Sequence, residues 1–386
     1  MPSAPKWQGG DVPDPLLARR ADYPILADCT YLISNSLGAM HSGTRDSLAA
    51  YAEQWGTRGV TAWPDWFDDV KRIADLVGAV VGAEPGSTIM QANVADAINA
   101  VVSTLAPGGS RRRIVTSAGD WPGTNYMWRE WVSRHGGEVV VVPLGSDGIT
   151  VDAQQIADEV DERTLAVSVS VVQFRTSALL DLDPVVEAAH RHGALLIADG
   201  YQAAGAVPID LAARGIDVCV GGSVKWLCGG PGNGWLSVRP ELTEAMKPTA
   251  VGWISHAHPF DFTFDDIEYA AGITRFAGGT PNIPAALAAE PAYAAVVEAG
   301  IAAIRARSIS LTQPIVEAAL ERGLTVNSPL DPAKRGGHVT IDPAPGDVPA
   351  TQAVCDELIR RGVIVDHRPG SGIRVAPHFY NEVGEA

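Results

Sequence analysis

A lysine and an aspartate each stand at the end of an apolar stretch of the sequence. Asp199 closes the stretch Leu195–Asp199, and Lys225 follows the stretch Ile216–Val220 at the start of a glycine-rich segment that runs to Gly234. A primary amine with small and apolar neighbours can lose its proton and attack a carbonyl group, which forms an imine. A carboxylate at a neighbouring strand end can keep a nitrogen base protonated. The two residues together predict imine chemistry supported by an acid.

Pyridoxal 5′-phosphate (PLP) is a cofactor that needs both groups. Its aldehyde forms an imine with a lysine, and its ring acts as an electron sink when a carboxylate keeps the ring nitrogen protonated. We therefore expect PLP as cofactor, Lys225 as its Schiff base and as the proton carrier, and Asp199 as the partner of the ring nitrogen. A lone lysine is usually solvated and a lone aspartate often lies in a turn, but their pairing at two strand ends favours the catalytic interpretation.

The composition is that of an acidic protein without the usual marks of nucleic-acid or membrane binding. The 386 residues include 29 basic and 45 acidic side chains, a net charge of −16, and 46% of residues are apolar. We expect no nucleic-acid partner, because phosphate binding requires a basic face, and no membrane partner, because no apolar run reaches spanning length. The four cysteines lack metal-ligand spacing and no signal peptide is apparent, so we expect no metal, reduced thiols and a cytoplasmic location.

Short apolar strands alternate with helices through the middle of the chain, which predicts an α/β fold with a mostly parallel, seven-stranded sheet and helices on both faces. The predicted strands are Thr88–Gln91, Ile114–Thr116, Glu138–Val142, Leu165–Val169, Leu195–Ala198, Val218–Val220 and Gly234–Val238. After about residue 285, long alanine-rich helices lead to further strands, which predicts a smaller α+β domain. We expect an N-terminal arm, or part of the small domain, at 1–45, a large cofactor domain at 46–284 and the small C-terminal domain at 285–386.

Several segments together resemble one known family over nearly the whole chain. They are Asn35–Gly38, Gln91–Asn99, Asp120–Pro122, Phe174–Asp181, Asp199–Gln202, Ser223–Lys225, Val251–Trp253, Gly279–Pro281 and Asp366–Pro377. The chain resembles a fold-type I PLP-dependent enzyme of the class V aminotransferase superfamily, and within it is most similar to kynureninase. The C-terminal segment and the aspartate–lysine pair are the specific parts of the resemblance.

The resemblance implies a set of cofactor contacts. Backbone amides at the positions of Val94 and Ala95 would hold the phosphate, since a helix N-terminus favours anions. The other implied cofactor residues are Trp121 as the stacking ring, Thr124, Gln202 near the ring hydroxyl, Ser223 at the phosphate, Trp253 and Thr280. The last of these would reach the neighbouring subunit's phosphate, which implies a homodimer with shared sites.

The resemblance also implies an amino-acid substrate. Arg374 would hold the substrate carboxylate, which a guanidinium matches with two parallel hydrogen bonds, and Asn35 and Ser36 would complete this part of the site. The freed Lys225 would then remove the Cα proton before a Cβ bond breaks. Histidines 256, 258, 338 and 378 fall outside the expected catalytic set, because an isolated histidine is more often solvated or packed.

The distal substrate pocket departs from kynureninase at four positions. Gln202 stands in place of a histidine, Thr124 in place of an acidic residue, Val224 in place of a tyrosine, and glycine around Gly278 in place of an asparagine that contacts the aryl group. Two reactions therefore stay open: Cβ–Cγ hydrolysis of the kynureninase type, and Cβ–S elimination from an S-substituted cysteine. A persulfide-forming desulfurase is disfavoured, because the stretch Val365–Gly372 has no cysteine.

Two further interpretations belong to other classes. A PLP enzyme with this constellation could instead catalyse transamination, epimerisation or decarboxylating deamination of a specialised amino acid, because one fold supports all these reactions. An inactive binding protein with the PLP fold is less favoured, because the lysine, the aspartate and the arginine all stand in their expected contexts. Product mass separates the first alternative from Cβ cleavage, and a colourless protein that ignores PLP would favour the second.

Overall fold

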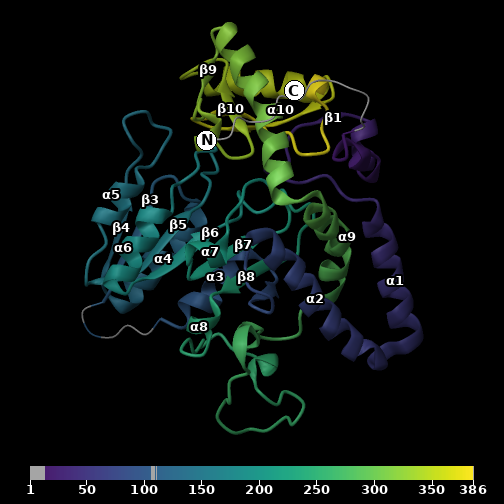
Figure 1. The fold of residues 1–386 in the computed structure, drawn as a ribbon, viewed down its shortest axis with the longest axis vertical. Helices are drawn as coiled ribbons and strands as arrows, with labels where there is room; N and C mark the ends of the chain where they lie inside the picture. The colour runs from purple at the N-terminus through teal and green to yellow at the C-terminus, as the bar shows by residue number, and fades with distance from the viewer. Residues whose placement is uncertain (1–13, 106–108, 110, 386) are drawn as a thin grey trace.

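The computed structural model describes residues 14–105, 109 and 111–385, and its centre is a seven-stranded sheet with the order β2-β8-β7-β6-β5-β3-β4 (Figure 1). The strands are β2 (Thr88–Gln91), β3 (Arg113–Ser117), β4 (Glu138–Val142), β5 (Thr164–Ser170), β6 (Leu195–Asp199), β7 (Val218–Gly222) and β8 (Gly234–Val238). β8 alone runs in the direction opposite to the other six strands of this sheet. The predicted mostly parallel, seven-stranded α/β fold is confirmed.

Helices cover both faces of this sheet because the strands are apolar on both faces. On β6, Ile197 packs in one core cluster while its neighbours Leu196 and Ala198 pack in the other, as the two-residue period of a strand requires. The core that includes Ile197 contains side chains of α3 (Val94–Val102) and α4 (Pro122–His135). The core that includes Leu196 and Ala198 contains side chains of α2 (Trp63–Val81) and α6 (Asp183–His192). Shorter helices complete the large domain at α5 (Ala153–Asp158), α7 (Leu211–Arg214) and α8 (Pro240–Thr243).

The C-terminal part forms a second, smaller layer above the sheet in Figure 1. α9 (Ile283–Ala299) packs against α1 (Gly43–Arg58), and α10 (Ile301–Glu321) leads into an antiparallel sheet with the order β12-β13-β10-β9, flanked by α11 (Val348–Arg360). The strands of this sheet are β9 (Thr325–Val326), β10 (Val339–Asp342), β12 (Asp366–Arg368) and β13 (Gly372–Val375). The expected small α+β domain is therefore present.

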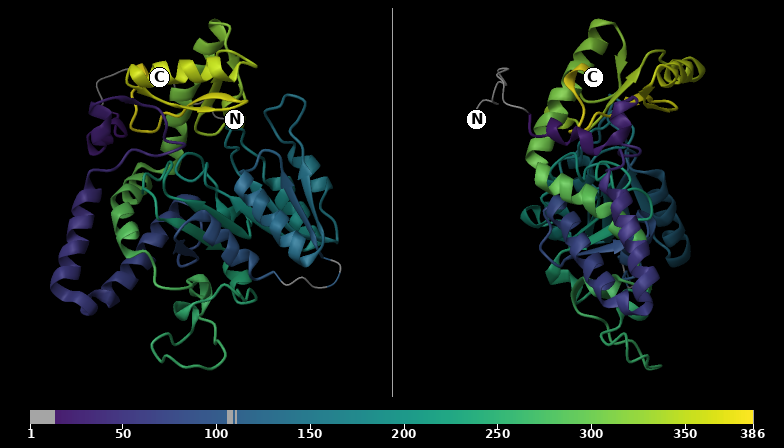
Figure 2. Two further views of the ribbon diagram at one scale, coloured as in Figure 1. Left: turned by 180° about the vertical axis from the view of Figure 1, so that it is seen from behind. Right: turned by 90° about the vertical axis from the view of Figure 1, so that its right-hand side faces the viewer.

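The N-terminal arm joins this smaller layer. β1 (Thr30–Tyr31) pairs in parallel with β11 (Val363–Ile364), and Figure 2 shows the purple arm beside the yellow C-terminal segments in both views. The domain limits predicted from the sequence stay predictions. Among the described helices, none is by itself long and apolar enough to cross a membrane, and only α9 and α10 together, bent by 84°, meet that criterion. The predicted cytoplasmic location stays a prediction.

Candidate active site

Asp199 and Lys225 leave the large sheet at neighbouring strand ends. Asp199 is the last residue of β6 and pairs with Val220 on β7, and Lys225 lies in the turn just beyond the end of β7. The ring of Tyr201 lies under the lysine, with its centroid 4.1 Å from Nζ. The Tyr201 N–H donates to Asp199 Oδ1 over 2.8 Å, so one residue orients both predicted catalytic groups.

Burial controls the charge of both groups. It lowers the pKa of Lys225, and the cations of Arg374 and Arg368 lower it further, while Asp199 acts against them. Burial raises the pKa of Asp199, which the Tyr201 N–H and the lysine oppose. Lys225 therefore loses its proton more readily than an exposed lysine does, and the neutral amine is the form that attacks a carbonyl group. The carboxyl group is stabilised in its charged form by any cation placed beside it.

Two glycines let other segments approach the lysine turn. A Cβ on Gly222 would lie 2.2 Å from the Tyr201 ring, so only glycine leaves room for that ring. Gly38 donates its N–H to the Val224 carbonyl over 2.6 Å, and a Cβ on it would lie 2.3 Å from the Lys225 carbonyl oxygen. The N-terminal loop is thus packed directly against the lysine turn.

Asn35 and Gln202 carry buried polar atoms where the N-terminal loop meets the residues that follow β6. Gln202 Nε2 donates to the Asn35 carbonyl over 3.0 Å, and both side chains are buried. Within the described part of the chain, Gln202 Oε1 and both side-chain polar atoms of Asn35 have no hydrogen-bond partner. Such buried atoms are unfavourable unless a ligand or water pairs with them. Ser36 is half-buried beside them, and its N–H donates to the Ile33 carbonyl.

The start of α3 offers donors for an anion. Asn93 caps the helix, its side chain accepts from the Asp96 N–H over 3.0 Å, and the first intrahelical bond runs from Ala97 to the Asn93 carbonyl. The N–H groups of Val94 and Ala95 come before that bond and have no hydrogen-bond acceptor among the residues that the structure describes, so they are available for a phosphate. Ser223, the other predicted phosphate residue, is fully buried and shares a hydrogen bond with the Tyr293 hydroxyl.

Arg374 is held from two sides. Its Nε and Nη2 donate to the two oxygens of Asp366 over 2.8 and 2.5 Å, and Nη1 donates to the Phe174 carbonyl over 2.9 Å. These bonds use three of the five N–H groups of a guanidinium, which leaves two for a carboxylate ligand. Arg368 also contacts Asp366, at 2.9 Å, so two cations share one carboxylate and the site keeps a net positive charge. Arg374 is only 1% exposed, which strengthens its electrostatic effect.

Trp121 contacts Phe174, the residue whose carbonyl accepts a hydrogen bond from Arg374. It precedes α4, its indole is 48% exposed, and it packs edge-to-face on the Phe174 ring with centroids 4.9 Å apart. An exposed ring face is what stacking on a planar ligand requires. Thr124 is buried one turn into α4, and its N–H donates to the Trp121 carbonyl.

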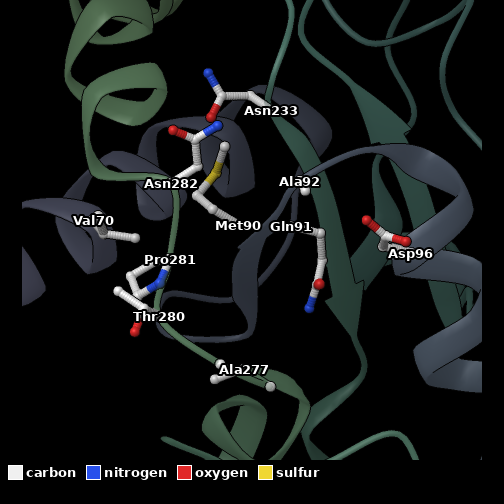
Figure 3. Close-up of a pocket in the computed structure, with 12 residues that line it drawn as sticks. Val70, Met90, Gln91, Ala92, Asp96, Asn233, Ala277, Thr280, Pro281 and Asn282 are labelled. Atoms are coloured by element: carbon white, nitrogen blue, oxygen red, sulfur yellow. The ribbon is translucent and has the colours of Figure 1, made fainter. Parts of the chain in front are cut away.

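Trp253 and Thr280 contact each other in a part of the molecule separate from the lysine turn. Trp253 Nε1 donates to Thr280 Oγ1 over 3.4 Å, and the Trp253 ring packs against Phe67 and Phe260. Thr280 borders a pocket of about 280 Å³ beside the start of α3, where Figure 3 shows it opposite Asp96. Thr280 is therefore near its own chain's predicted phosphate site, and its predicted role at the neighbouring subunit stays a prediction.

Four residues of the site were not predicted from the sequence. They are Tyr201, Phe174, Asp366 and Asp120. Asp120 is buried and accepts the backbone N–H groups at the ends of β3 and β5 over 2.7 and 2.6 Å, and its charge helps raise the pKa of Asp199. A carboxylate just beyond a strand end was the available signal for it. Phe174 contacts Arg374 from 200 residues away, so no local signal marks it. Tyr201 and Asp366 lie only two and eight residues from their partners Asp199 and Arg374, but their residue types alone assign them no role.

The chain belongs to the aminotransferase class-V family, whose model matches residues 61–378. Kynureninase of Deinococcus radiodurans is 30% identical, covering 93% of this chain and 87% of that protein, and kynureninase of Pseudomonas fluorescens is 29% identical, covering 93% and 86%. An uncharacterized aminotransferase of Bacillus subtilis, YcbU, is 29% identical and covers 93% and 92%.

Solved structures show the same fold. A mutant of the enzyme C-DES with glycine covalently linked to its PLP cofactor superposes with a TM-score of 0.85 at 18% identity, covering 97% of both chains. A cysteine desulfurase of Thermococcus onnurineus gives a TM-score of 0.83 at 18% identity, covering 95% of this chain and 94% of that one. The predicted family, fold type and cofactor are confirmed: this is a fold-type I, PLP-dependent enzyme family.

The residues of this chain fit PLP. The lowered pKa of Lys225 suits an imine-forming amine, Asp199 lies at the adjacent strand end, and Gln202 Oε1 is buried without a partner in the described structure. The free N–H groups at the start of α3 suit the phosphate. PLP would thus be held between the ends of β6 and β7 and the first turn of α3.

Proposed function

We propose that the protein is a PLP-dependent enzyme that cleaves a Cβ bond of an α-amino acid, with kynureninase-type Cβ–Cγ hydrolysis as the first candidate reaction. The observation that carries this proposal is the position of Asp199 at the end of β6 and of Lys225 just beyond the paired strand β7. The charges of Asp199 and Arg374 also act on the pKa of Lys225, so an amine, an acid and a guanidinium fork belong to one buried site. The kynureninase relatives, which match more than nine-tenths of the chain, support the choice of reaction.

Each residue has a defined task in this proposal. PLP, when bound, supplies an electron sink that stabilises negative charge at the substrate's α-carbon. Lys225, whose pKa is lowered by burial, takes the Cα proton as a neutral amine. Asp199 keeps a positive charge on the pyridine nitrogen favourable, and the two unused N–H groups of Arg374 bind the carboxylate and orient Cα.

The cysteines do not support a persulfide-forming reaction. Burial raises the pKa of Cys228 to about 12, although it lies beside the lysine turn, and burial also raises the pKa of Cys355 inside α11. A nucleophilic cysteine needs an exposed thiolate in a positive environment. Elimination at Cβ–S from an S-substituted cysteine needs no thiol of the enzyme, so it is the second candidate reaction.

We also propose a homodimer. Phe260, Phe262 and Phe264 are all exposed on the loop between α8 and α9, which protrudes at the lower end of Figure 1. Three exposed phenylalanines in one loop are unusual for a surface that faces only water. The rings of Phe260 and Phe262 also contact the Trp253 ring, which contacts Phe67. These aromatic side chains form one apolar surface that a second copy of the chain could cover. Sedimentation should give twice the chain mass of 40.5 kDa, and a concentration-independent monomer would contradict this proposal.

The reaction is tested by visible absorption during titration of the purified protein with L-kynurenine. A yellow protein whose band shifts and which releases anthranilate would support Cβ–Cγ hydrolysis, and Lys225→Ala is the inactive control. Cleavage of a cysteine S-conjugate without kynurenine turnover would select Cβ–S elimination. A product that keeps the whole side chain would contradict Cβ cleavage. A protein that stays colourless after PLP is added would overturn the proposal.

A further inference from the structure

His338 lies on the face of the small sheet that carries Arg374. It directly precedes β10, where side chains alternate, so His338 and Thr340 point to the same side. Thr340 pairs with Arg374 across β10 and β13, and directly opposed residues share a face. The turn Phe174–Ser177 contacts all three: it accepts from Arg374 Nη1 over 2.9 Å, from Thr340 Oγ1 over 2.6 Å and from the His338 N–H over 3.1 Å.

The backbone around His338 is held tightly. Ser177, which accepts the His338 N–H at its side chain, has a φ of 62° although it is not glycine. Its carbonyl accepts from the Gly336 N–H over 2.6 Å. A Cβ on Gly337 would lie 2.6 Å from the indole of Trp226, the residue that follows Lys225. The segment is therefore packed onto the lysine turn, and residues in sparsely populated backbone conformations concentrate at functional sites.

The imidazole of His338 is buried without a partner. It has no exposed surface, and neither ring nitrogen makes a hydrogen bond to any residue that the structure describes. Burial lowers its pKa well below the usual value, and the charges of Arg374, Lys225 and Arg368 lower it further, against a backbone carbonyl at Arg175. A neutral imidazole has one donor and one acceptor nitrogen. The Arg175 carbonyl, which already accepts from Thr340 Oγ1, lies near enough to raise the pKa of the ring but outside hydrogen-bonding geometry, so no hydrogen bond in the described structure fixes which nitrogen carries the proton. His378, also fully buried, bonds the Trp226 carbonyl over 2.8 Å instead.

We propose that His338 binds the amino-acid substrate, donating a hydrogen bond from its neutral imidazole to the carboxylate that Arg374 holds. Arg374 has two N–H groups left, and a carboxylate has about four lone-pair positions. The carboxylate can therefore accept from Arg374 and from His338 together. The inference rests on the proposed function, because it assumes an amino acid in this site. It adds a specificity-determining residue that the sequence pattern left outside the expected catalytic set.

The test measures binding of L-alanine to the PLP-loaded protein by its spectral change, because L-alanine has the carboxylate and almost no side chain. His338→Leu should raise the dissociation constant for L-alanine about tenfold or more, since a bond to a charged group is lost, and should leave the affinity for PLP unchanged. His338→Gln, which keeps a donor, should recover part of the loss. In steady-state kinetics, His338→Leu should likewise raise the KM for the amino acid while kcat changes by less than about threefold.

Thermal unfolding of the PLP-free protein gives a second readout. His338→Leu should keep or raise Tm, because it removes a buried polar group without a partner. The control is His367→Leu, which removes a buried histidine of β12 that bonds Gln352 over 2.9 Å. This control should lower Tm and leave L-alanine binding unchanged. Wild-type affinity in His338→Leu, or no response of the wild-type protein to L-alanine, would overturn the inference. A wild-type protein that binds no PLP would instead overturn the proposed function.

Discussion

Asp366 occupies one whole edge of the Arg374 guanidinium. The two residues face each other across β12 and β13, and their paired bonds of 2.8 and 2.5 Å lie beside a third bond from Arg374 to Phe174. The fork that we assign to the substrate is therefore oriented before any substrate arrives. Such preorganisation lowers the entropy lost on binding.

Arg374→Ala should weaken amino-acid binding far more than PLP binding. The two N–H groups that remain free on Arg374 would be lost, and a charge-assisted, paired contact is among the stronger hydrogen bonds in proteins. We expect the affinity for L-alanine to fall by about 100-fold, from roughly 3 kcal/mol of lost binding. Titration with L-alanine and with PLP measures both constants, and an equal loss of the two would argue against a carboxylate clamp.

Asp366→Asn should lower the stability of the fold and also raise the KM for the substrate. It removes the charge that Arg374 and Arg368 share, and a buried cation left without its partner destabilises a protein. Since the Asp366 side chain is 22% exposed, we expect about 2 kcal/mol of lost folding free energy, below the usual value for a fully buried pair. Denaturant unfolding checks this, and KM for the amino acid should rise several-fold because the fork loses its orientation. An unchanged KM would show that Asp366 only stabilises the fold.

Lys225→Met should abolish turnover and change how stability depends on pH. Burial lowers the pKa of Lys225 below the ordinary 10.5, so the unfolded chain binds more protons between the lowered pKa and 10.5. Stability contributed by this residue therefore rises with pH in that window. The PLP-free variant should lack that rise and be more stable than the wild type near neutral pH. Denaturant unfolding of both proteins from about pH 6 to about pH 11, chosen to bracket the window, measures the difference. Parallel curves would show that the amine is not desolvated.

The long elements of the fold could be predicted because their patterns are local. The strands Thr88–Gln91 and Glu138–Val142 have the predicted bounds, since an apolar run with turn residues on both sides defines a strand. The paired strands β1 and β11 were not predicted, because two residues are too few to show any period. The end of α3 at Val102 likewise has no strong signal in the sequence.

The site could be predicted only where a residue type at a strand end indicated its chemistry. Asp199 is such a residue, because an aspartate that closes an apolar strand lies where α/β sheets bind ligands. The pairing of Tyr201 with Gly222 was not predictable, since it depends on how two strands lie side by side. The buried, unpartnered state of His338 likewise depends on residues distant in the sequence.

Gly222→Ala should disturb the lysine through Tyr201. The added Cβ would lie 2.2 Å from the Tyr201 ring, whose centroid is 4.1 Å from Lys225 Nζ, so the ring and the amine must both move. We expect at least a tenfold weaker affinity for PLP and a loss of about 1–3 kcal/mol in stability from overpacking.

A double substitution tests whether the effect passes through that ring. Tyr201→Ala with Gly222→Ala should recover much of the stability that Gly222→Ala alone loses, because the clash is gone, and neighbouring residues of this kind show non-additive energies. The control is Gly56→Ala, whose added Cβ meets no atom within 4 Å in α1 and should be neutral or slightly stabilising. Additive losses in the double variant would mean that Gly222 is needed for its own backbone conformation and that Tyr201 does not position Lys225.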